Sequence, residues 1–140
     1  MKGLDTNVLV RYLTEDDPAQ ARKAAAWIST TVARGDRCFI SPVVLCELAW
    51  VLRAAYRVSK ADLLLTLDRL LATTQFVIGD KDLVRTALET YRTGRAEFAD
   101  YLIGEIHRDA GCDRTALCCR GEEQHVSVLR LEAAKHLPSA

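Results

Sequence analysis

Short runs of apolar residues alternate along the chain with longer stretches in which apolar side chains recur every three or four positions. The short runs at 2–4, Cys38–Ile40 and Phe76–Ile78 predict strands. The longer stretches predict amphipathic helices, which we place at 7–13, 18–34, 42–56, 59–71, 80–92 and 97–110. Two further strands are predicted at Thr115–Cys118 and Val126–Leu129.

Capping residues at the starts of several predicted helices support these assignments. Acidic residues at 15–17 stand just before Pro18, and Ser41 precedes Pro42, so each proline falls in the first turn of a helix. Ser59, three residues before Asp62, has the spacing of a capping pair. These signals fix where three of the helices begin.

The order of the elements predicts an α/β fold. Strands that alternate with helices favour a parallel sheet covered by helices on both faces. No repeat, low-complexity tract or linker divides the chain, so we expect a single domain over residues 1–140. Ligands of open parallel sheets bind beyond the carboxyl ends of the strands, and Asp5 stands at that edge.

The composition narrows the possible functions. Basic and acidic side chains are equal in number, at 19 each, which excludes a basic tail or a positive field over the whole molecule. Any contact with nucleic acid must therefore be local or mediated by metal. The 5 cysteines show no Cys-x-x-Cys spacing, and no apolar run approaches the roughly 20 residues needed to cross a bilayer. We expect a soluble cytoplasmic protein with free thiols that makes no membrane contact.

Two carboxylates stand where the sequence is otherwise apolar. Asp5 follows the first predicted strand and is either a helix N-cap or a ligand. Glu47 has Val43, Val44 and Trp50 as helical neighbours, so we expect it to lose hydration. A salt bridge to an arginine, a bound metal ion, or a retained proton would each compensate for that loss.

A third carboxylate, Asp100, lies at the edge of an apolar helical stripe, with Glu97 one turn before it. Each of these two, taken alone, fits a solvated helix edge. In combination with Asp5 and Glu47, however, converging acids repel one another and require a cation. Oxygen ligands without histidine select a hard ion, Mg²⁺ or Mn²⁺, which can hold a phosphate oxygen and activate water.

Three segments together resemble a known family. They are LDTNVL at 4–9, SPVVLCEL at 41–48 and EFADYLI at 97–103, in the order and at the separations of successive motifs of the PIN domain. More narrowly, the set is similar to VapC-type toxins of bacterial toxin–antitoxin pairs. The resemblance covers nearly the full chain, and the ordered set is more specific than any one motif.

The resemblance implies a three-layer α/β/α fold with a short central parallel sheet. It also implies a Mg²⁺-dependent (or Mn²⁺-dependent) endoribonuclease in which Asp5 and Asp100 are metal ligands and Glu47 is the third catalytic acid. Thr6 and Asn7 match positions that support the first aspartate or the scissile phosphate. The partners implied are an RNA substrate, a cognate antitoxin protein that holds the toxin inactive, and a second copy in a homodimer.

The sequence departs from the family pattern near its end. Relatives usually carry Thr-x-Asp after the fourth strand, and the matching position here is Cys119. A thiol is a poor partner for a hard cation, although Glu122 or Glu123 could supply the missing acid. The alternative function is therefore a catalytically impaired PIN-like domain that acts by binding RNA or protein. A phosphate-handling receiver-like or dehalogenase-like domain fits less well, because the second aspartate that the latter needs is Asn7 here.

The tryptophans and arginines on the predicted helices do not require a catalytic role. Trp27 and Trp50 are expected in the core or at an interface, since both lie on predicted helices. We expect the dimer interface on apolar helix surface around Trp50, Tyr56 and 64–71. Arginines on the predicted helices could contact phosphates, but solvated helix faces explain them equally well.

Overall fold

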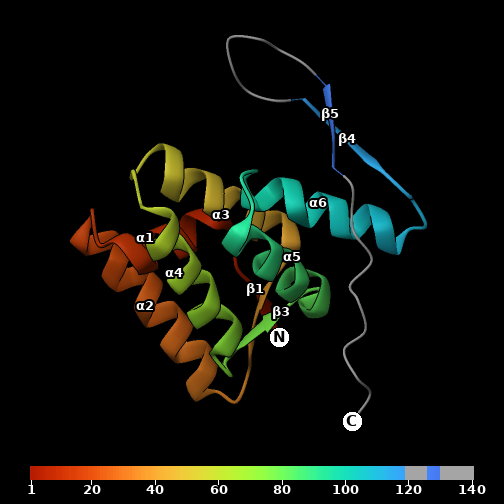
Figure 1. Ribbon diagram of the computed structural model, residues 1–140. Helices are drawn as coiled ribbons and strands as arrows, with labels where there is room; N and C mark the ends of the chain where they lie inside the picture. The colour runs from red at the N-terminus through yellow and green to blue at the C-terminus, as the bar shows by residue number, and fades with distance from the viewer. Residues whose placement is uncertain (119–125, 130–140) are drawn as a thin grey trace.

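The computed structural model describes residues 1–118 and 126–129 (Figure 1). The elements in the first half are β1 (Lys2–Gly3), α1 (Thr6–Thr14), α2 (Pro18–Ala33), β2 (Cys38–Ile40), α3 (Pro42–Ala54) and α4 (Lys60–Ala72). Those in the second half are β3 (Phe76–Ile78), α5 (Lys81–Thr93), α6 (Phe98–Asp109), β4 (Thr115–Cys118) and β5 (Val126–Leu129). Every helix and strand predicted from the sequence is present.

A small parallel sheet lies at the centre, with strand order β1–β2–β3. Lys2 pairs with Cys38, and Cys38 pairs with Phe76 on its other side. Helices enclose these short strands in Figure 1, and the mostly helical arrangement is consistent with the predicted three-layer α/β/α fold. Because the strands run parallel, their carboxyl ends share one edge, where α1 and α3 begin.

The core is aliphatic, as the composition predicts, and each helix contributes one stripe to it. On α3 the fully buried leucines are Leu45 and Leu48, and on α4 they are Leu63 and Leu67. Burial of each such side chain contributes about 1.5–3 kcal/mol. The two tryptophans are not part of this core: Trp27 is 45% exposed and Trp50 is 57% exposed. Of the two expected positions the core is therefore wrong, because both side chains stand on the outer faces of their helices, and a position at an interface stays a prediction.

The predicted helix starts are confirmed by side-chain hydrogen bonds. The Asp17 carboxylate accepts from the backbone of Gln20, with Pro18 at the first helical position. In the same way the Ser41 hydroxyl accepts from Val44 N and the Ser59 hydroxyl from Asp62 N. Each cap satisfies a backbone N–H that the helix itself leaves unpaired.

The last two strands differ from the expected single parallel sheet. β4 pairs antiparallel with β5 in a separate two-stranded sheet, with Thr115 opposite Leu129 (Figure 1). The reason is the short connection, since only residues 119–125 separate the two strands. Parallel neighbours need a crossover of a dozen residues or more, so strands this close in sequence pair antiparallel.

Two further observations concern the cysteines and the length of the helices within residues 1–118. Cys38, Cys46 and Cys112 have free thiols. None of the helices in this part of the chain combines the length and the apolar character needed to span a membrane.

Candidate functional site

Asp5 lies just past the carboxyl end of β1 and caps helix α1. Its Oδ1 atom accepts a hydrogen bond of 2.8 Å from Val8 N, which confirms the N-cap interpretation. The side chain is exposed, and its Oδ2 atom has no hydrogen-bond partner within residues 1–117. Capping thus orients the carboxylate at the sheet edge and leaves one oxygen available to a ligand.

Glu47 lies on the outer face of α3 and is exposed. Its helical neighbours Val43 and Trp50 are themselves 72% and 57% exposed, whereas Leu45 and Leu48 form the buried face. The expectation that Glu47 loses its hydration is therefore wrong. The apolar side chains around it in the sequence belong to an exposed apolar surface, which spacing alone does not distinguish from core.

Thr6 links the first helix to the third. This side chain is only 8% exposed, and its Oγ1 donates a hydrogen bond of 2.5 Å to Glu47 Oε2. The partner of Glu47 is therefore a threonine, and no arginine forms an ion pair with it in the described part of the chain.

Asp100 lies in the first turn of α6 and is half-buried rather than fully solvated. Its Oδ2 atom accepts a hydrogen bond of 3.0 Å from the backbone N–H of Glu97. The pKa of the Cys46 thiol is raised, first by burial and then by the negative charge of Asp100. Because α3 and α6 pack together, Asp100 lies near the residue that precedes Glu47.

The three predicted acids are brought together only in part. Asp5 and Glu47 are connected through Thr6, and Asp100 is placed beside Cys46. Among the residues that the structure describes, no three His, Cys, Asp or Glu side chains are close enough to hold a metal ion by themselves. Mg²⁺ usually takes one or two carboxylates and completes its shell with water and substrate phosphates. The carboxylate oxygens of Asp5 and Asp100 that lie outside the capping hydrogen bonds fit that chemistry.

A cavity of about 490 Å³ opens beside Asp5. Its walls come from the β1–α1 junction, from α1 and from α2, and its lining residues are Gly3, Leu4, Asp5, Asn7, Val8, Arg11, Gln20, Lys23, Ala24 and Trp27. Glu47 and Asp100 are not in this lining. Sequence reasoning missed the α2 wall, although the spacing of 20, 23, 24 and 27 marks one helical face.

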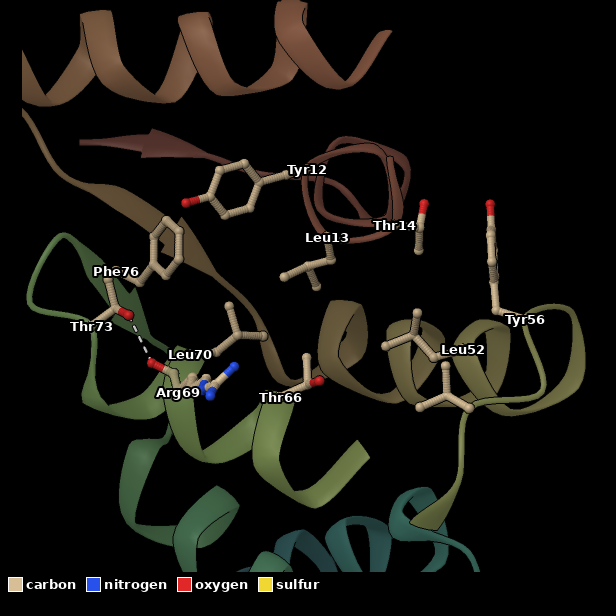
Figure 2. Close-up of a pocket in the computed structure, with 11 residues that line it drawn as sticks. Tyr12, Leu13, Thr14, Leu52, Tyr56, Thr66, Arg69, Leu70, Thr73 and Phe76 are labelled. Carbon is tan, nitrogen blue, oxygen red and sulfur yellow. Dashed lines mark hydrogen bonds between the residues drawn. The ribbon is translucent and has the colours of Figure 1, made fainter. Parts of the chain in front are cut away.

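A second cavity, of about 530 Å³, has walls from the carboxyl-terminal part of α1, from α3, α4 and β3, and from the segment between α3 and α4 (Figure 2). It is lined by Tyr12, Leu13, Thr14, Leu52, Tyr56, Val58, Thr66, Arg69, Leu70, Thr73 and Phe76, so it contains no carboxylate. The rings of Tyr12 and Phe76 meet edge to face with centroids 6.4 Å apart. None of the predicted site residues borders this second cavity.

The structure is an α/β domain with the carboxylate of Asp5 at the carboxyl edge of its parallel sheet and Glu47 linked to the same segment through Thr6. The PIN domain family matches residues 3–113, and the chain belongs to that family. PIN domains are generally nucleases, act on nucleic acid and typically use a divalent metal ion. No curated protein and no solved structure gives a match to the chain.

Proposed function

We propose that this PIN domain is a Mg²⁺- or Mn²⁺-dependent endoribonuclease, the toxin of a toxin–antitoxin pair acting in the cytoplasm. The observation that carries the proposal is the hydrogen bond from Thr6 to Glu47. It joins two acidic segments 41 residues apart in the sequence and holds Glu47 beside the segment that carries Asp5. The Thr6 hydroxyl is buried and needs a hydrogen-bond partner, and because that partner is a carboxylate, the same bond fixes the position of Glu47.

Each site residue has a proposed role. Asp5 and Asp100 hold the metal ion, and each keeps one carboxylate oxygen outside its capping hydrogen bond. Glu47 adds negative charge to the same site, and Thr6 fixes its position. Asn7, exposed beside Asp5, donates to the RNA backbone. Mg²⁺ or Mn²⁺, when bound, supplies a Lewis acid for a phosphate oxygen and for water.

The alternative function is a catalytically impaired PIN domain that acts by binding RNA or protein. The observation that favours it is Cys119, which stands in the sequence where relatives carry a fourth acid. Cys119 and the two glutamates that could replace it, Glu122 and Glu123, lie outside the described residues. A thiol supports a hard cation poorly, so this alternative predicts RNA binding with little cleavage.

We also propose two protein partners, a cognate antitoxin and a second copy of the chain in a homodimer. Trp50 and Leu65, within the expected interface surface, are 57% and 46% exposed, so apolar surface is available there. Tyr56 contributes less, since its hydroxyl donates to Asp16. Light scattering at high micromolar concentration is expected to give twice the mass of the chain. A monomer mass under those conditions would remove the homodimer.

The proposed activity is tested by incubating the purified chain with a mixed single-stranded RNA pool. We expect cleavage with Mg²⁺ or Mn²⁺ and none after chelation, because the acids then lack a cation. Ca²⁺ serves as a control cation of the same charge. Equal cleavage in the presence of excess chelator would contradict the metal requirement. RNA binding without cleavage under every condition would favour the impaired domain.

A further inference from the structure

Trp27 presents a large part of its indole to solvent on the outer face of α2. Its side chain is 45% exposed, and within residues 1–117 it forms no ring contact with another aromatic residue and its indole N–H has no hydrogen-bond partner. An exposed indole is a large flat apolar surface, and nucleobases stack on such surfaces. Trp27 also lines the cavity that contains Asp5, so a group stacked on it would lie in the same cavity as a proposed catalytic acid.

The cation nearest to Trp27 along the same helical face is Lys23, one turn earlier on α2. Lys23 is exposed and its side chain forms no ion pair or hydrogen bond within residues 1–117. The other cation of the cavity, Arg11, is held by both carboxylate oxygens of Asp16 at 3.0 Å. Lys23 is therefore the charge that remains available for a phosphate.

The cavity is suited to one nucleotide. Its volume of about 490 Å³ is within the usual range for small-ligand sites, about 300–1,000 Å³. Ala24 lies between Lys23 and Trp27 in the sequence. Because its side chain ends at Cβ, it leaves space in the cavity beside these two longer side chains. Gln20 and Asn7 add amide groups that can donate to and accept from a base edge.

We propose that this cavity is a subsite for one nucleotide of single-stranded RNA, in which the base stacks on Trp27 and Lys23 binds a phosphate. The proposal rests on the proposed function, since it names the part of the substrate that this side of the active site receives. It makes Trp27 a residue that selects unpaired RNA, because bases in a duplex cannot leave their stack without cost.

Binding is measured separately from cleavage. Trp50→Phe leaves Trp27 as the single tryptophan, and excess chelator prevents metal-dependent cleavage. Titration with a mixed RNA of about eight nucleotides is expected to quench the Trp27 fluorescence, whereas the same RNA in a duplex quenches little. RNA that binds by anisotropy without any quenching would overturn the subsite, and so would a complete absence of RNA binding.

Substitutions of Trp27 and Lys23 test the proposed base contact and the proposed phosphate contact separately. By anisotropy, Trp27→Leu is expected to weaken binding of single-stranded RNA about tenfold, with Trp27→Phe closer to the native chain. Lys23→Ala should weaken binding for all sequences and reduce the slope of log affinity against log salt by about 0.7. Arg69→Ala is the matched control, because Arg69 is an exposed cation on the second cavity. Equal affinities for Trp27→Leu and the native chain would overturn the proposal.

Cleavage by the same variants separates this proposal from the proposed function. Metal-dependent cleavage that is undiminished in Trp27→Leu would overturn the subsite and leave the nuclease in place. Quenching of Trp27 by RNA in a chain that never cleaves would support the subsite and overturn the nuclease. Melting temperatures of all variants confirm that the exposed substitutions leave the fold intact.

Discussion

Helix α1 contributes to the walls of two cavities of similar size, only one of which contains a carboxylate among its lining residues. The first cavity, of about 490 Å³, contains the carboxylate of Asp5 and the cations Arg11 and Lys23. The second cavity, of about 530 Å³, is lined by apolar and hydroxyl side chains such as Leu13, Leu70 and Thr73 and by the cation Arg69, but by no carboxylate (Figure 2). Their volumes do not distinguish the two cavities. The carboxylate of Asp5 does, so the type of side chain in the lining, and not the size of the cavity, identifies the candidate active site.

Asp16, which follows the carboxyl end of α1, contacts one lining residue from each cavity. Its carboxylate accepts hydrogen bonds from Arg11, a residue of the first cavity, and from Tyr56, a residue of the second. Asp16 therefore neutralises one cation of the first cavity while fixing the position of an aromatic ring in the second. Within the described part of the chain the two cavities have no lining residue in common, and only Asp16 and helix α1 connect them. We therefore expect that a substitution in one cavity has little effect on the other.

The largest expected effect comes from the carboxylate of the first cavity. Asp5→Asn should reduce metal-dependent cleavage at least about 100-fold, since an amide replaces a charged ligand. Asparagine caps helices as well as aspartate does, so the melting temperature should change little. Cleavage assays and thermal melts on the same preparation check both outcomes. A large fall in the melting temperature would attribute the loss to folding instead.

A smaller loss is expected from Thr6→Val, which keeps the shape of the side chain and removes its hydroxyl. Glu47 then loses the donor that holds it, and cleavage should fall between about 10-fold and 100-fold. Thr6→Ser should restore most of the activity. In a Glu47→Ala background Thr6→Val should add nothing further, because the two residues act through one interaction. An additive loss would show that Thr6 has a separate role.

A gain is expected from Cys119→Asp, which returns an acid to the position where relatives carry one. Cleavage with Mn²⁺ should rise at least about tenfold, which is about 1.4 kcal/mol in barrier. Asp5→Asn in the same background should abolish the gain. Strong native activity with no improvement would show that the fourth acid is dispensable or is supplied by Glu122 or Glu123.

The smallest effect concerns the second cavity. The pKa of Asp16 is lowered from 3.8 to about 2, chiefly by the hydrogen bond from Tyr56 and then by those from Thr14 and Arg11. Tyr56→Phe should move this pKa back toward 3.8, as measured by titration of the Asp16 carboxyl in NMR spectra. Cleavage at neutral pH should stay within about twofold of native, because this wall lacks every proposed catalytic group.

The same hydrogen bond predicts a pH dependence of stability. Since the pKa of Asp16 is lower in the folded chain than in the unfolded chain, its stabilisation is present above 3.8 and is lost as the pH falls through about 2. The difference in melting temperature between native and Tyr56→Phe chains should therefore shrink from about pH 6 to about pH 2. A constant difference would mean that Tyr56 stabilises the fold by packing alone.

The sequence by itself determined the elements that depend on local interactions. Spacing of apolar residues located the helices, and Asp17, Ser41 and Ser59 marked helix starts, because a cap contacts backbone only three residues away. The position of Asp5 at the sheet edge follows for the same reason, since it needs only a strand followed by a helix.

Only the tertiary structure decided which face each helix buries and which distant side chains meet. It exposed Glu47 and paired it with Thr6, and it placed Trp27 beside Asp5 in one cavity. Apolar spacing reports that a helix is amphipathic, but exposed and buried apolar residues look alike in a sequence. A contact between residues 41 positions apart depends on how the helices pack, and no local signal carries that information.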